Sequence, residues 1–140
     1  MPQLNAYLIF DGNCADAMRF YERTLGGKLE ALLTYAEMPG GCSEMSPGSV
    51  NRIMHARLVI DEGLLMGSDS PIGQPYEGMK GFSLALAYPT ADDAQFVFNV
   101  LAEGGNVTMP LQKTFWADAF GMLTDRFRTP WMINGALKDM

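Results

Sequence analysis

The chain contains 140 residues, of which 48% are hydrophobic, and this length and composition suit one globular domain with a core of its own. Its 16 acidic residues outnumber its 10 lysines and arginines, which gives a formal net charge of −6. No cluster of basic side chains is available to bind phosphates along a strand of nucleic acid. We therefore expect no nucleic acid among its partners.

The sequence contains no run of about 18 uncharged apolar residues and no basic start typical of a secretory signal. These features predict no membrane contact and a location in the cytoplasm. The two cysteines, Cys14 and Cys42, lack the spacing of a metal site, and we expect both to be reduced thiols.

The chain begins with a pattern of strand, helix and strand. Apolar side chains alternate over residues 4–10, which predicts a strand. Apolar residues at spacings of three and four over residues 14–25 predict a helix with one buried stripe. Asn13 is the candidate N-cap of this helix, Gly26 and its neighbouring glycine end it, and residues 28–38 form the next expected strand.

Two more strands are expected before the middle of the chain. Residues 39–50 are rich in Gly, Pro and Ser and predict a long loop, which we interpret as a lid over a cleft. Alternation then predicts a strand over residues 51–60 and a further strand over 64–67. Residues 70–79 contain several prolines and glycines and form the expected linker.

The second half repeats the order of the first. A strand is expected over residues 80–88, Thr90 is the candidate N-cap, and residues 91–102 form a helix that ends at a second Gly-Gly pair. The remaining expected strands cover residues 106–111, 116–124 and 131–134.

The repetition points to an internal duplication. Strand residue Tyr7 precedes its counterpart Ala85 by 78 residues, and the helix residues Phe20 and Phe98 and the two Gly-Gly pairs keep this offset. We expect two modules, one at about 1–69 and one at about 80–140, each with the order strand, helix, strand, strand, strand. Because neither sheet can cover both of its faces alone, we expect pairing of modules within the chain or between chains.

Several stretches of the sequence resemble the vicinal oxygen chelate superfamily, which includes glyoxalases, dioxygenases and bleomycin resistance proteins. Within this superfamily they resemble the PhnB-like branch. The matching stretches follow one another along nearly the whole chain. They are Tyr7 to Cys14 with Phe20-Tyr21, Leu25 to Gly27, Ile53 to Ala56, Leu65 to Asp69, Gly104 to Leu111, Thr114 to Trp116, Phe120 to Met122, and Trp131 to Asn134.

This resemblance implies an α+β fold in which two βαβββ modules form a glyoxalase-like, cup-shaped sheet. It also implies a homodimer with a cleft in each unit. The metal-dependent members place His or Gln on the opening strand of each module and Glu on the closing strands. Those ligands suit a divalent cation that binds vicinal substrate oxygens.

The corresponding positions in this chain carry other side chains. The opening-strand positions are Asn5 and Ser83, and the closing-strand positions lie around Met66 and Met132. This set lacks every charged ligand, so we predict no metal and no other cofactor. A different divalent site that uses His55, Glu37 or Glu44, or one histidine from each subunit of a dimer, is the alternative.

His55 and Arg57 are the candidate catalytic residues. Alternation puts both on the face opposite Ala56 and Leu58, which we expect to lie against the helix. An imidazole can transfer a proton, and a guanidinium can bind a carboxylate or phosphate. In the alternative interpretation, His55 is a hydrogen-bonded strand residue without chemistry.

The cleft is expected to contain further polar and aromatic side chains. The opening-strand residues would supply a polar floor, or contacts across a dimer, and Trp116 could stack on a flat ligand, or pack in a core. The expected ligand-binding residues are Asn5, Tyr7, His55, Arg57, Ser83 and Trp116.

Two functions follow as hypotheses. The first is metal-independent binding of a small apolar or oxygenated molecule in the cleft. The second is an enzyme of the lyase, isomerase or dioxygenase kind that acts on a small oxygenated substrate with His55 and Arg57. A scaffold whose cleft is filled by side chains is a third interpretation.

Overall fold

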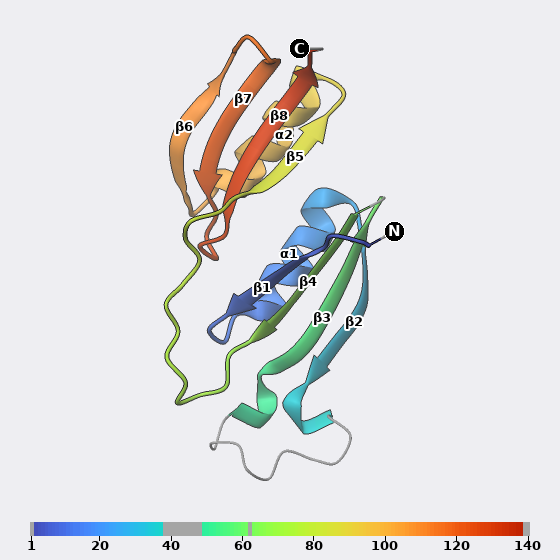
Figure 1. The fold of residues 1–140 in the computed structure, drawn as a ribbon, viewed down its shortest axis with the longest axis vertical. Coiled ribbons are helices and arrows are strands. Elements are labelled where there is room, and N and C mark those ends of the chain that lie inside the picture. Colours follow the sequence, from blue (N-terminus) through green and yellow to red (C-terminus); the bar gives the residue numbers. More distant parts are fainter. Residues whose placement is uncertain (1, 38–48, 62, 139–140) are drawn as a thin grey trace. The chain divides into compact units, whose positions relative to one another are not determined.

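The structure is a computed structural model that describes residues 2–37, 49–61 and 63–138. It divides into two compact units, Met1–Gly78 and Met79–Met140, each of which has its own sheet (Figure 1). None of the helices in the described ranges is long and apolar enough to cross a membrane.

The first unit contains a four-stranded mixed sheet and one long helix. Its strands run in the order β1-β4-β3-β2, with β1 parallel to β4 and the other neighbours antiparallel. Its elements are β1 (Ala6–Phe10), α1 (Cys14–Leu25), β2 (Lys28–Thr34), two short 3₁₀ helices (Tyr35–Glu37 and Ser49–Asn51), β3 (Ile53–Ile60) and β4 (Gly63–Asp69).

The second unit repeats this topology. Its strands run in the order β5-β8-β7-β6, with β5 parallel to β8 and the other neighbours antiparallel. Its elements are β5 (Leu84–Tyr88), α2 (Ala91–Ala102), β6 (Asn106–Gln112), β7 (Ala117–Thr124) and β8 (Pro130–Leu137). The predicted α+β fold of two βαβββ modules is confirmed.

Each helix covers one face of its own sheet, as Figure 1 shows, and this contact forms the core of each unit. The buried side chains of each helix fall at helical spacing, because only one stripe of a helix can face a sheet. They are Cys14, Ala17, Met18, Phe20 and Tyr21 in α1, and Ala94, Val97, Phe98 and Leu101 in α2. Within the described residues, the other face of each sheet carries no helix of its own unit.

Several predicted boundaries were wrong by a few residues. The strand expected over 28–38 ends at Thr34, where the Glu37 carboxylate accepts from the Thr34 backbone N–H and hydroxyl and turns the chain. The strand expected over 80–88 starts at Leu84. The last two strands of the modules, β4 and β8, are longer than expected, since the pairing of each with two neighbours extends along their length.

The caps agree with the sequence at one helix and disagree at the other. The Thr90 hydroxyl accepts from the Asp93 N–H and caps α2 as predicted. Asn13 precedes α1, but its side chain makes no capping hydrogen bond. Most of the loop expected over 39–50, with Glu44, lies outside the described residues, and its last two residues belong to a short 3₁₀ helix, Ser49–Asn51.

Candidate ligand-binding site

The helix-free face of the first sheet carries three of the predicted site residues, Tyr7, His55 and Arg57. Ala56 and Leu58 are fully buried on the helix side of β3, so the alternate residues His55 and Arg57 face the other way. In β1, Leu8 is buried in the same way, and Tyr7 lies on the exposed face with 45% of its surface accessible. Strand alternation therefore places these polar side chains where the sequence predicted.

Tyr7 and His55 are in contact. The Tyr7 hydroxyl lies 3.3 Å from Nδ1 of His55, and the two rings stack with centroids 5.9 Å apart and planes inclined by 26°. Because β4 lies between β1 and β3, this contact bridges a strand. Which of the two atoms donates depends on the tautomer of the imidazole. The pair can pass a proton to or from a molecule that lies on this face.

Arg57 has a different partner from His55. Its Nε lies 3.2 Å from Oε1 of Glu30 in β2, and both side chains are nearly half exposed. A contact of this kind is weak because water competes for both charges. The sequence did not reveal Glu30 as a partner, because a register irregularity between Leu29 and Ala31 decides which β2 residue reaches Arg57.

Arg57 and Asn5 line one hollow of about 300 Å³. Asn5 lies just before β1 instead of inside a strand, in an exposed segment. The other residues that line the hollow are Gln3, Leu4, Val59, Asp61, Gly63 and Leu64. The sequence did not single out Asp61, which lies between the strands expected over 51–60 and 64–67.

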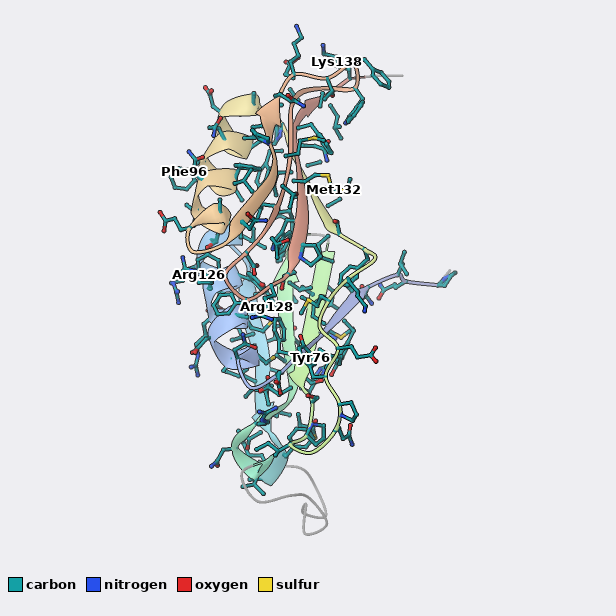
Figure 2. The ribbon with its side chains drawn as sticks, turned by 90° about the vertical axis from the view of Figure 1, so that its left-hand side faces the viewer. Tyr76, Phe96, Arg126, Arg128, Met132 and Lys138 are labelled. Carbon is teal, nitrogen blue, oxygen red and sulfur yellow. The ribbon has the colours of Figure 1, made fainter. Side chains whose placement is uncertain are left out.

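The helix-free face of the second sheet is apolar and aromatic. The backbone at Gly121 and Gly135 lies close to Phe98 and Ala94 of α2, so the alternate residues of β7 and β8 face away from the helix. Met122 and Met132 pair directly on this face, and Figure 2 shows Met132 on the side opposite α2.

Trp116 lies at the start of this face. Its Nε1–H donates to Oδ1 of Asn134 at 3.3 Å. Its ring meets Phe120 edge-on, with centroids 5.1 Å apart at 69°, and Phe115 in the same manner at 4.8 Å and 84°. The three rings form an aromatic group, with Asn134 as the polar contact that fixes the indole.

The predicted site residues thus form separate groups. In the first unit the structure brings together Tyr7 with His55, and Asn5 with Arg57. Trp116 belongs to the second unit and contacts Asn134, which the sequence did not single out as a site residue. Ser83 is half-buried and lies just before β5.

The residues at the metal-ligand positions do not suit a divalent cation. Met66 pairs with Tyr7 and Arg57, and Met132 pairs with Ala85 and Met122, so no carboxylate or imidazole is a direct cross-strand neighbour of either thioether. Thioethers are soft ligands, whereas Mg²⁺, Mn²⁺ and Zn²⁺ are bound by carboxylates, imidazoles or thiolates. In the ranges that the structure describes, no three His, Cys, Asp or Glu residues lie close enough together to hold a metal ion.

In the first unit, the pKa values of Tyr35 and Cys14 are raised. Burial is the main cause for Tyr35, with smaller contributions from Tyr7 and Asp69, and the Tyr35 hydroxyl donates to the Asp69 carbonyl oxygen at 2.8 Å. Burial, followed by the Asp69 carboxylate, raises the pKa of the Cys14 thiol. Both groups therefore stay neutral at neutral pH, and Cys14 is not a nucleophile.

The sequence profile of the Glyoxalase/Bleomycin resistance protein/Dioxygenase superfamily matches residues 3–133. The chain therefore belongs to this superfamily. Its α+β fold is of the glyoxalase type, since a crystal structure of protein PA1353 from Pseudomonas aeruginosa matches 96% of this chain and 97% of its own, with a TM-score of 0.88 and 47% identity.

Two further relatives extend this result. Protein YjdN of Escherichia coli strain K12 is 39% identical over 142 aligned positions, which cover 96% of this chain and 95% of YjdN. A structure of the PhnB protein from Bacillus cereus matches 95% of this chain and 98% of its own with a TM-score of 0.78, and at 24% identity it shows the fold alone. The predicted membership of the superfamily is confirmed.

Proposed function

We propose that this protein binds a small apolar or oxygenated molecule without the metal ion of its metal-dependent relatives. The observation that carries the proposal is the aromatic and thioether face of the second sheet. Trp116, Met122 and Met132 offer apolar surface there, and Asn134 is the polar group among them. Phe120 is only 6% exposed and supports the Trp116 ring from below the surface. Flat rings and flexible thioethers suit a small molecule that is held mainly by burial of apolar surface.

The chain contains two tryptophans, which makes this proposal directly testable. Trp116 contacts the open face, whereas Trp131 is only 2% exposed on the helix side and donates to the Asp125 carboxylate at 2.8 Å. In a ¹H–¹⁵N spectrum each indole N–H gives its own signal, and Trp116→Phe assigns them. Titration with 1-naphthol, a flat apolar molecule with one hydroxyl, is expected to shift the Trp116 signal saturably and to leave the Trp131 signal in place.

A pair of variants locates the binding. Met132→Ala is expected to weaken the binding of 1-naphthol at least about threefold, because it removes apolar contact area. Phe96→Ala is the matched control, since Phe96 is 68% exposed and points away from the sheet on the outer side of α2 (Figure 2). If 1-naphthol produces no saturable shift of the Trp116 signal, or if Phe96→Ala weakens binding as much as Met132→Ala, the proposal is wrong.

We also propose that the protein acts as a homodimer in the cytoplasm. Exposed apolar side chains in both units, among them Ile9, Phe82 and Phe115, support an association that would cover them. Light scattering after gel filtration is expected to give twice the chain mass of 15.4 kDa. A mass of 15.4 kDa over a hundredfold range of concentration would contradict the dimer.

The contact between Tyr7 and His55 favours a second candidate, an enzyme that acts on a small oxygenated substrate. A phenol and an imidazole in contact can exchange one proton with a substrate hydroxyl or carbonyl group, and Arg57 on the same face could hold a substrate anion. For any substrate that the protein turns over, His55→Ala is expected to lower kcat by at least about a hundredfold. Unchanged turnover by His55→Ala would eliminate this candidate.

A further inference from the structure

The hollow in the first unit differs in chemistry from the aromatic face of the second. Its lining residues come from β3, from β4 and from the segment before β1, with Asp61 just after β3. Its volume of about 300 Å³ is at the lower end of the range for small-molecule pockets. It can therefore hold a molecule of modest size.

Arg57 supplies a positive charge to this hollow. Its Nε is directed to Glu30, and this is the hydrogen bond that the structure gives the guanidinium among the residues it describes. The two Nη groups are left as a parallel pair of donors. Such a pair matches the two oxygens of a carboxylate, which it can bind with two hydrogen bonds.

Asp61 supplies a negative charge to the same hollow. It sits at the end of β3 with a φ of 46°, a left-handed conformation that aspartate adopts more readily than most residues. A ligand with only negative charge would meet repulsion from Asp61, and one with only positive charge would meet repulsion from Arg57. A ligand that carries both charges satisfies both residues.

The rest of the lining suits the body of such a ligand. Leu4, Val59 and Leu64 can contact a short carbon chain, and the amides of Gln3 and Asn5 can bond to further polar atoms. We propose that this hollow binds a small zwitterion, a molecule with one carboxylate and one ammonium group. Arg57 binds the carboxylate and Asp61 the ammonium group. This site is independent of the aromatic face of the second unit.

The test compares three probes of equal chain length. In 4-aminobutanoate both charges are present, whereas butanoate lacks the ammonium group and butylamine lacks the carboxylate. Their dissociation constants are measured on the full-length protein from amide shifts in ¹H–¹⁵N spectra at low salt. We expect 4-aminobutanoate to bind at least about tenfold more tightly than either of the others, with shifts at Arg57 and Gly63.

Two variants assign the charges. Arg57→Gln is expected to weaken the binding of 4-aminobutanoate at least about tenfold and to leave the binding of butylamine unchanged or stronger. Asp61→Asn is expected to weaken the binding of 4-aminobutanoate to the same extent and to leave the binding of butanoate unchanged or stronger. Arg126→Gln is the matched control, because it removes a surface arginine that pairs with Glu103 in the other unit, and should change nothing. Equal binding of the three probes by the unaltered protein, or no saturable shift at the hollow, overturns the proposal whether or not the variants fold.

Discussion

The carboxylate of Asp69, at the end of β4, accepts a hydrogen bond from the backbone N–H of Cys14, the first residue of α1, at 3.0 Å. The same oxygen accepts from the N–H of Gly12 at 2.9 Å, and the other oxygen accepts from the N–H of Ile53 at 2.9 Å. Asp69 is only 2% exposed. One buried carboxylate therefore accepts hydrogen bonds from backbone N–H groups at the start of α1, and it also links β4 to the beginning of β3.

Replacing Asp69 should be among the most damaging changes to the first unit. Asp69→Ala leaves three backbone donors without their acceptor, and we expect the free energy of unfolding to fall by about 3–5 kcal/mol. Asp69→Asn should not restore stability, because its NH₂ group would face at least one of these donors. Urea unfolding followed by circular dichroism measures both effects.

An exposed aspartate provides the control for this prediction. Asp118 forms an ion pair with Lys138 at 3.4 Å, and both side chains are well exposed. Asp118→Ala is expected to cost less than about 1 kcal/mol, as surface ion pairs usually do. A loss at Asp69 as small as the loss at Asp118 would contradict the role of the buried carboxylate.

The two helix caps offer a direct comparison. Thr90→Ala removes the hydroxyl that accepts from Asp93 N–H, so we expect a loss of about 1 kcal/mol in the free energy of unfolding. Asn13→Ala should change it by less than about 0.5 kcal/mol, because the Asn13 side chain makes no capping bond. Equal losses at the two positions would show that the Asn13 side chain caps α1 in solution.

The difference between these caps shows what local sequence can and cannot predict. Thr90 and its partner Asp93 are three residues apart, so a local motif was sufficient to identify the cap. The acceptor for α1 is Asp69, which is 55 residues from Cys14 in the sequence. Only the pairing of β1 with β4 brings that carboxylate to the helix, and no local pattern contains this information.

The same reasoning applies to the candidate site. Strand alternation was enough to predict that His55 and Arg57 share a face, because side chains of a strand alternate strictly. The contact of His55 with Tyr7 depends on strand order, and that of Arg57 with Glu30 depends on a bulge in β2. Both are decided by tertiary structure, so the sequence could nominate the residues but not their partners.

Cys14 should resist thiol reagents while the protein is folded. Burial and the nearby Asp69 carboxylate raise the pKa of this thiol, so the reactive thiolate is almost absent at neutral pH. In a Cys42→Ser variant, Ellman's reagent at pH 8 is expected to detect no thiol until denaturant is added, and then one. Rapid reaction of the folded variant would contradict the burial of Cys14.

The raised pKa of Cys14 also predicts how stability changes with pH. The folded state holds the proton more tightly than the unfolded state, whose thiol loses it near the ordinary value of 9.0. The contribution of the Cys14 thiol to the free energy of unfolding is therefore fully present below pH 9. It decreases as the pH rises further toward the pKa of the folded state. Cys14→Ala should unfold with a weaker dependence on pH between 9 and 10.5, which urea titrations at several pH values would measure.

Gly135 controls how closely α2 approaches the second sheet. A Cβ at this position would lie 2.8 Å from Cβ of Ala94 and 2.9 Å from the Thr90 carbonyl oxygen, and the latter cannot move without the helix. We therefore expect Gly135→Ala to lower the free energy of unfolding by about 1–3 kcal/mol. Gly63→Ala is the control, because its nearest contact is 3.3 Å and its cost should be smaller. Thermal unfolding of both variants measures the difference. A Gly135→Ala protein as stable as the parent would show that α2 can shift away from the sheet without loss.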